Sequence, residues 1–99
     1  MEEALKLGEN LFFERKFGWA RVQKELEKRQ FSPQVVDEVM KKLDPGYEER
    51  HIKYVILGKY GRRLFIDHEK EKITRSLVRF GYPEDKIQNV LESLERAEF

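Results

Sequence analysis

Apolar residues recur along this chain at helical spacing, and the pattern occurs twice. Residues 17–44 align without gaps with residues 68–95, and the apolar positions of the two segments coincide. Positions at i, i+3, i+4 and i+7, which are typical of amphipathic helices, run through both. The chain is therefore predicted to use one helical unit twice. The matched pairs are Val22 with Ile73, Leu26 with Leu77, Phe31 with Tyr82, Val36 with Ile87, Val39 with Val90, Met40 with Leu91, and Leu43 with Leu94.

A further amphipathic helix is predicted before each of these helix pairs. The first carries Ala4, Leu7, Leu11 and Phe12 on one face, and the second carries Tyr47, Ile52, Val55 and Ile56. The endings KFG and KYG predict that the helices stop at Gly18 and Gly61, because glycine is the usual residue just past a helix end. Gly18 lies four residues before Val22, whereas Gly61 lies twelve before Ile73. The second unit is therefore expected to contain an insertion near residues 64–71.

Capping and turn residues mark the boundaries inside and between the units. Ser32 is a predicted N-cap with Pro33 as the first helical residue. Gly81 is predicted to end one helix and Pro83 to open the next. Residues 44–46 read Asp-Pro-Gly, a turn too short to let two domains move freely.

These signals together predict an all-α fold built from tandem three-helix repeats. Residues 1–44 would form the first repeat and residues 45–99 the second, packed end to end into one continuous domain with an elongated, curved body. Strand-like alternation is nowhere long enough to compete.

Composition narrows the class of protein. Charged residues make up 39% of the 99 residues, against about 25% in ordinary globular proteins, and a net charge of +1 indicates no overall attraction to nucleic acid or membrane. The absence of cysteine excludes disulfides and thiolate metal sites, and it fits a reducing cytoplasm. The acidic start and the lack of a long apolar run predict neither a signal peptide nor a membrane span.

Basic residues, however, are distributed unevenly. On the helix that carries Val22 and Leu26, Lys24 and Lys28 fall on the opposite face with Arg21 at its flank, and the aligned residues of the second unit are also basic. The charges of the last helix in each unit are not matched in this way. We therefore predict a set of DNA- or partner-binding residues, namely Arg15, Lys16, Arg21, Lys24, Lys28, Lys59, Arg62, Arg63, Lys72, Arg75 and Arg79.

The second unit is also electrically polar. Residues 59–79 contain seven basic and three acidic residues, whereas residues 83–99 contain two basic and five acidic ones. A basic stripe of this kind can meet phosphates or an acidic protein groove. The alternative is a solvated helix surface with i, i+4 ion pairs such as Glu71 with Arg75.

The sequence predicts no enzyme, cofactor or metal site. His51 and His68 do not share a helical face at ligand spacing, and both are expected to be exposed. No nucleophile stands beside a base, the carboxylates are too numerous to single out a pair, and the isolated glycines do not form a phosphate loop. Trp19 is predicted to be a packing residue rather than a stacking platform for bases.

Residues 17–43, FGWARVQKELEKRQFSPQVVDEVMKKL, resemble the repeat of the RecX family, the regulators of the RecA recombinase. Residues 70–94 resemble the last repeat of that family, in which the link between the first two helices is often longer. The resemblance spans about residues 3–95, with two units where family members usually have three. The residues that carry the resemblance are Gly18, Arg21, Val22, Glu25, Leu26, Phe31 and 36–43 in the first unit, and Lys70, Lys72, Leu77, Arg79, Phe80, Gly81, Tyr82 and Ile87 in the second.

The resemblance implies a non-enzymatic protein of DNA repair and recombination. Such a protein would bind the RecA filament on single- or double-stranded DNA and restrain its growth or activity, with weak binding to DNA alone. Two alternatives remain open: a helix-turn-helix DNA-binding module in which residues 32–43 form the recognition helix, and a protein-interaction adaptor that binds no nucleic acid. The recognition helix would lack a basic or amide cluster beyond Gln34, and its second copy begins with the acidic PEDK.

Overall fold

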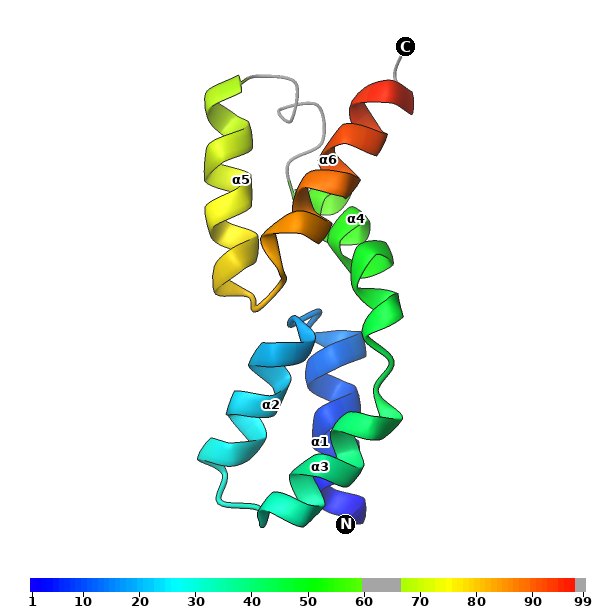
Figure 1. The fold of residues 1–99 in the computed structure, drawn as a ribbon, viewed down its shortest axis with the longest axis vertical. Helices are drawn as coiled ribbons and strands as arrows, with labels where there is room; N and C mark the ends of the chain where they lie inside the picture. The colour runs from blue at the N-terminus through cyan, green and yellow to red at the C-terminus, as the bar shows by residue number, and fades with distance from the viewer. Residues whose placement is uncertain (60–66, 98–99) are drawn as a thin grey trace.

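The computed structural model describes residues 1–59 and 67–97, and within these ranges it describes the side chains except those of 67–69 and 97. Over the described residues all regular secondary structure is helical and there is no strand, which confirms the all-α prediction (Figure 1). The elements in order are α1 Glu2–Glu9, the π-helical turn η1 Asn10–Glu14, α2 Trp19–Lys28, α3 Pro33–Lys42, the 3₁₀ turn η2 Pro45–Tyr47, α4 Glu48–Lys59, α5 Asp67–Arg79 and α6 Glu84–Ala97.

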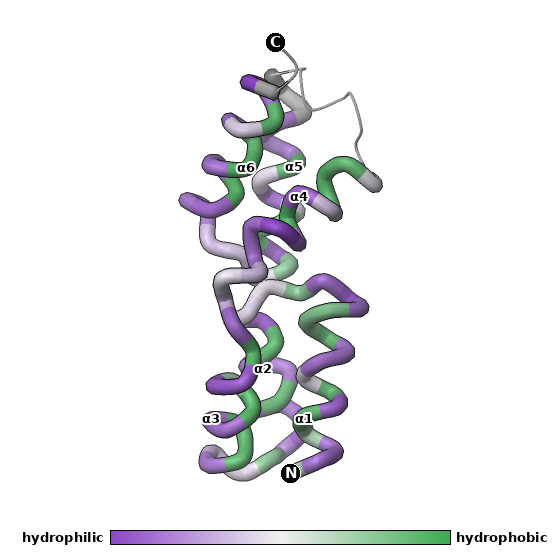
Figure 2. The backbone as a smooth tube through the Cα atoms, turned by 90° about the vertical axis from the view of Figure 1, so that its right-hand side faces the viewer, coloured by the Kyte–Doolittle hydropathy of each residue, from purple (hydrophilic) through white to green (hydrophobic). Residues whose placement is uncertain are grey.

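The helices pack in two groups. Helices α1 to α3 surround one buried apolar cluster and α4 to α6 surround a second, and half-buried Phe80 packs against both clusters. The two groups follow one another along the longest axis, on which the Cα trace extends 46 Å against 20 Å on each of the others (Figures 1 and 2).

The predicted core positions are buried in both groups. Of the seven aligned apolar pairs, each member is buried except Phe31, which is half-buried opposite a buried Tyr82. Along each helix, hydrophobic positions alternate with hydrophilic ones (Figure 2), as burial of one face requires. Among the described residues, no helix is both long and apolar enough to cross a membrane.

The predicted caps at Ser32 and Gly81 and the predicted turn at residues 44–46 are formed. The Ser32 hydroxyl accepts a hydrogen bond from the Val35 amide at 3.3 Å. The Asp44 carboxylate accepts one from the Gly46 amide at 2.8 Å, which fixes the turn between the two groups. Gly81 has φ +99° and ends α5, and α6 begins just after Pro83.

The predicted end of the first helix at Gly18 is wrong. The helix widens into η1, where the Arg15 amide donates to the Asn10 carbonyl at 2.9 Å, and the chain then leaves helical geometry at Lys16, which has φ +59°. Gly18 has φ −66° and is instead the N-cap residue of α2. The first helix therefore ends before Lys16, and the glycine that reads as a stop signal precedes the first residue of the following helix.

Two further expectations concern α4 and the insertion. Tyr47 lies in η2 with 39% of its surface exposed and does not belong to the buried face of α4. The predicted stop at Gly61 and residues 64–66 of the insertion lie outside the described residues, while residues 67–71 form the first turns of α5.

Candidate functional site

Helices α5 and α2 follow one another along one side of the molecule (Figure 1). The C-terminal end of α5 meets the N-terminal end of α2, where the Gly18 amide donates to the Phe80 carbonyl at 2.6 Å and Arg21 Nη1 donates to the Arg79 carbonyl at 3.0 Å. At about 1.5 Å per residue, the two helices would run for roughly 35 Å. We call the basic residues carried by this side the basic edge: Arg21, Lys24, Lys28, Lys72, Arg75 and Arg79.

Part of the basic edge lines a groove between α2 and the end of α5. The groove has a volume of about 360 Å³, and its basic members come from both helix groups. One acid, Glu25, lies among them, 3.8 Å from Arg21 and 3.7 Å from Lys28. Its lining carries four cations and one carboxylate and is made by Ala20, Arg21, Lys24, Glu25, Lys28, Val78, Arg79 and Gly81.

Within the groove the cations are not equivalent. Arg21 places its guanidinium carbon 4.0 Å from the centre of the Phe17 ring in addition to its hydrogen bond to the Arg79 carbonyl. These contacts hold α2 to α5, so Arg21 has a structural role. Lys24 is exposed and forms no ion pair among the described residues, which leaves its ammonium group available to a ligand.

Other predicted binding residues gather around an aromatic pair at the same junction. Phe17 and Phe80 meet edge to face with ring centres 5.7 Å apart. Arg15 lies 5.4 Å from the Phe17 ring and Lys59 lies 5.8 Å from the Phe80 ring, distances at which a cation is attracted to an aromatic face. The aromatic pair therefore brings together cations that lie far apart in the sequence.

The remaining predicted binding residues have different positions. Lys16 donates to the Phe13 carbonyl, and its ammonium lies 5.0 Å from the Tyr54 ring, so it packs against α4. Lys72 and Arg75 are exposed on α5, two turns and one turn before Arg79. Arg62 and Arg63 lie outside the described residues.

A buried carboxylate that the sequence did not single out joins the two helix groups. Glu48, at the start of α4, is 2% exposed and accepts hydrogen bonds from the Trp19 amide and from Lys86 Nζ, both at 2.9 Å. Lys86 also donates to the Pro45 carbonyl at 3.1 Å. Because Gly18 has no side chain to cap α2, the carboxylate of Glu48 supplies that acceptor from the other group.

Trp19 and Tyr82 extend this junction. The Trp19 indole donates to the Leu43 carbonyl at 2.7 Å, which confirms that the tryptophan is a packing residue. The Tyr82 hydroxyl donates to the Lys16 carbonyl from the other group. Burial, together with the negative charge of Glu48, raises the pKa of Tyr82, so the phenol stays protonated as a donor.

The expected exposure of His51 is wrong. His51 is 5% exposed and lies among Phe12, Phe13 and Tyr47, with ring centres 4.9 to 6.0 Å away. Its Nδ1 is buried and has no hydrogen-bond partner. Burial, followed by the charges of Lys16 and Arg50, lowers the pKa of His51, so the ring is neutral at physiological pH. The side chain of His68 is not among the side chains that the structure describes.

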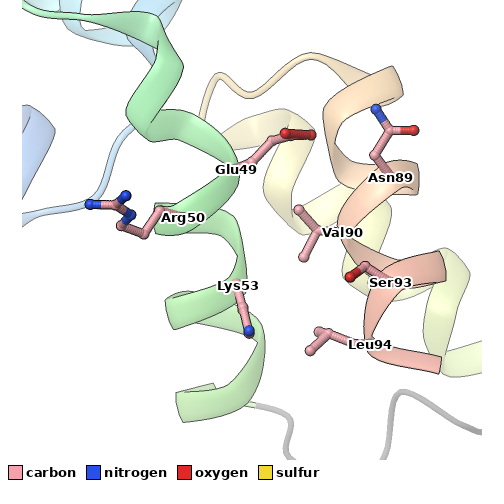
Figure 3. Close-up of a pocket in the computed structure, with 7 residues that line it drawn as sticks. All are labelled: Glu49, Arg50, Lys53, Asn89, Val90, Ser93 and Leu94. Carbon is pink, nitrogen blue, oxygen red and sulfur yellow. The ribbon is translucent and has the colours of Figure 1, made fainter. Parts of the chain in front are cut away.

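A second groove, of about 330 Å³, lies between α4 and α6 (Figure 3). Val90 and Leu94 face α4 across it, whereas Arg50 points away from α6. Its lining includes neither histidine nor cysteine, and no group of three potential metal ligands occurs in the part of the chain that the structure describes.

Comparison with protein-family models, with curated proteins and with solved structures found no match to this chain. Function is therefore inferred from the residues and geometry of the chain itself. The basic edge holds six of the eleven predicted binding residues, three from each helix group.

Proposed function

We propose that this chain is a non-catalytic, cytoplasmic regulatory protein of the RecX type, which binds RecA filaments on DNA and inhibits their growth or activity. The proposal rests on the resemblance of residues 17–43 and 70–94 to the RecX repeat. The structural observation that supports it is the head-to-tail arrangement of α5 and α2, the two helices that carry the matched basic residues. A filament on DNA offers a repeating, negatively charged surface. An extended row of cations can contact several negative charges of such a surface at once.

The proposal includes the repeat architecture. We interpret residues 1–44 and 45–99 as tandem three-helix repeats within one elongated, curved body. The interpretation is supported by the buried aligned pairs, such as Val22 with Ile73 and Leu26 with Leu77, and by the similar order of helices in each group. Repeats of this kind give an extended surface that can contact successive subunits of a polymer.

A helix-turn-helix DNA-binding module is the first alternative. It is disfavoured because α6, the second copy of the would-be recognition helix, opens with exposed Glu84 and Asp85, which would be repelled by the phosphates that border the major groove. An adaptor that binds protein and no nucleic acid is the second alternative. The binding test below distinguishes it from a RecX-type regulator.

The test compares binding to single-stranded DNA, to duplex DNA and to RecA assembled on single-stranded DNA. We expect weak binding to either DNA alone, tighter binding to the filament, and slower ATP hydrolysis with shorter filaments at saturation. The effect should be weaker than that of a three-repeat relative, because each further repeat adds contacts without a second loss of translational and rotational freedom.

The association and dissociation rates give an additional criterion. Fewer contacts should raise the dissociation rate of this two-repeat chain more than they lower its association rate. If the chain affects neither hydrolysis nor filament length while a three-repeat relative inhibits in the same buffer, the proposed function is wrong. Equal binding to bare DNA and to the filament would favour the DNA-binding module.

A further inference from the structure

The groove between α2 and α5 combines charge with an exposed apolar side chain. Val78 is 47% exposed and lines the groove beside Arg79, across from Lys24 and Lys28 on α2. Ala20 and Gly81 are also part of the lining, and their small size leaves room for a chain to approach closely. The groove therefore offers both an apolar contact and positive charge.

We infer that this groove binds an acidic protein segment that carries an apolar side chain between its carboxylates. The apolar side chain would cover Val78, and the flanking carboxylates would pair with Lys24 and Arg79. This inference deepens the proposed function, on which it rests for the identity of the partner, because it assigns the groove to protein contact rather than to DNA.

Charge supports an acidic ligand. Four cations and one carboxylate line a space of about 360 Å³, so the groove has an excess of positive charge. Arg21 is held by Phe17 and by the Arg79 carbonyl, and Glu25 lies within 4 Å of both Arg21 and Lys28. Lys24 and Arg79 are thus the cations that can turn to meet carboxylates.

The apolar side chain argues for protein rather than for a nucleic-acid backbone. A phosphate placed against Val78 would lose water without gaining a partner, which is unfavourable for a charged group. A valine also offers no flat face on which a base can stack, whereas single-stranded DNA sites depend on aromatic platforms. Glu25 adds to this preference, because its carboxylate repels a continuous row of phosphates but can be accommodated between the spaced charges of a peptide.

The experiment uses two fluorescent peptides and the whole chain. Both peptides consist of glutamate and serine; one has a central leucine and the other has serine at that position. We expect saturable binding of both, with the leucine peptide about fivefold tighter, as partial burial of one apolar side chain would give. Oligothymidylate is titrated in parallel as the nucleic-acid probe.

Three variants identify the groove. Val78→Ser should remove the advantage of the leucine peptide and leave the serine peptide unaffected. Lys24→Glu should weaken both peptides, and Lys41→Glu, on the exposed surface of α3, should weaken them less. Circular dichroism melting of each variant checks that the helices remain folded.

Several outcomes would overturn the inference. These are no saturable binding of either peptide, equal affinity for the two peptides, or an equal effect of Lys24→Glu and Lys41→Glu. Val78→Ser weakening oligothymidylate as much as the leucine peptide would assign the groove to DNA. None of these measurements contains RecA, so a failure here leaves the filament test of the proposed function independent.

Discussion

Gly18 and Gly81 lie with their backbones in direct contact, although 62 residues separate them in the sequence. The Gly18 amide donates to the carbonyl of Phe80 at 2.6 Å, and a Cβ atom on Gly18 would lie 2.2 Å from the carbonyl carbon and oxygen of Gly81. A Cβ atom on Gly81 would in turn lie 2.4 Å from Cβ of Arg21. This contact joins the end of α5 to the start of α2, and the basic edge depends on it.

Replacement of Gly18 by alanine should therefore destabilise the protein. No side chain fits at 2.2 Å from backbone atoms, so the two helix groups must separate, and overpacking of this kind costs about 1 to 3 kcal/mol. Gly58→Ala is the control, because nothing lies within 4 Å of a Cβ atom there. Since Gly58 lies in the last turn of α4, alanine should raise the free energy of unfolding by at most about 0.5 to 1 kcal/mol. Urea denaturation measures the free energy of unfolding of both variants. Equal changes in the two variants would contradict the close contact between Gly18 and Gly81.

Glu48→Gln should weaken the junction, whereas Glu49→Gln should have little effect. Glu48 is buried, and its two carboxylate oxygens accept separately from the Trp19 amide and the Lys86 ammonium. Glutamine has only one oxygen, so its NH2 group must face one of these donors, and Lys86 loses its counter-ion. Loss of such a buried partner costs about 1 to 3 kcal/mol. Glu49 is exposed on the next position of the same helix. Denaturation midpoints of the two variants give the comparison.

A double-mutant cycle tests whether Glu48 acts through Lys86. The combination of Glu48→Gln with Lys86→Met should be less destabilising than the sum of the single variants, because removal of one partner already breaks the pair. Additive effects would show that the two side chains contribute independently.

The stability of the protein should fall as the pH is lowered through the range in which histidine titrates. The pKa of His51 is lowered in the folded protein from an ordinary value of 6.5. The unfolded chain therefore takes up the proton first, and the contribution of His51 is full above about pH 6.5 and declines below it. Lys16 and Arg50 add to the effect by repelling a further positive charge, and the buried Nδ1 atom of His51 has no hydrogen-bond partner.

The variant His51→Phe separates this residue from other titrating groups. It keeps an aromatic ring among Phe12, Phe13 and Tyr47 but cannot be protonated. The free energy of unfolding, measured between pH 8 and pH 5, should decline less steeply for the variant than for the original protein. Identical pH dependence would mean that His51 is not protonated preferentially in the unfolded chain.

Local signals in the sequence predicted the helices and their cores but not the junction. The spacing of Leu26, Val39, Leu77 and Val90 is enough to place them inside, because a helix has one apolar face and must bury it. Ser32 could be predicted as an N-cap because a cap depends only on the first turn of its own helix.

The junction was missed because its contacts join residues remote in sequence. Gly18 resembles a helix stop, and nothing local indicates that it faces Gly81. Glu48 looks like any surface glutamate of a highly charged chain until the structure places Trp19 and Lys86 beside it. His51 is polar in character and was expected outside, yet the π turn η1 places Phe12 and Phe13 over it. Likewise, the predicted cations could be chosen from the sequence, but the structural role of Arg21 could not.

DNA binding, if it runs along α5, should depend on Lys72 and Arg75. These residues lie on the basic edge beyond the groove lining and are exposed. Every phosphate contact that is lost should reduce the slope of log affinity against log salt concentration by about 0.7 to 0.9. We therefore expect the double variant Lys72→Glu, Arg75→Glu to bind single-stranded DNA more weakly and with a shallower salt dependence.

Two matched double variants show whether position or total charge matters. Lys41→Glu with Lys42→Glu changes the net charge by the same amount on α3, where both lysines are exposed, and should leave the slope nearly unchanged. Lys24→Glu with Lys28→Glu changes the groove, and its effect on the slope should be smaller than that of the α5 pair. Equal reductions from all three pairs would show that DNA responds to net charge alone. An equal reduction from the α5 and groove pairs would extend the DNA contact into the groove and contradict its assignment to an acidic protein segment.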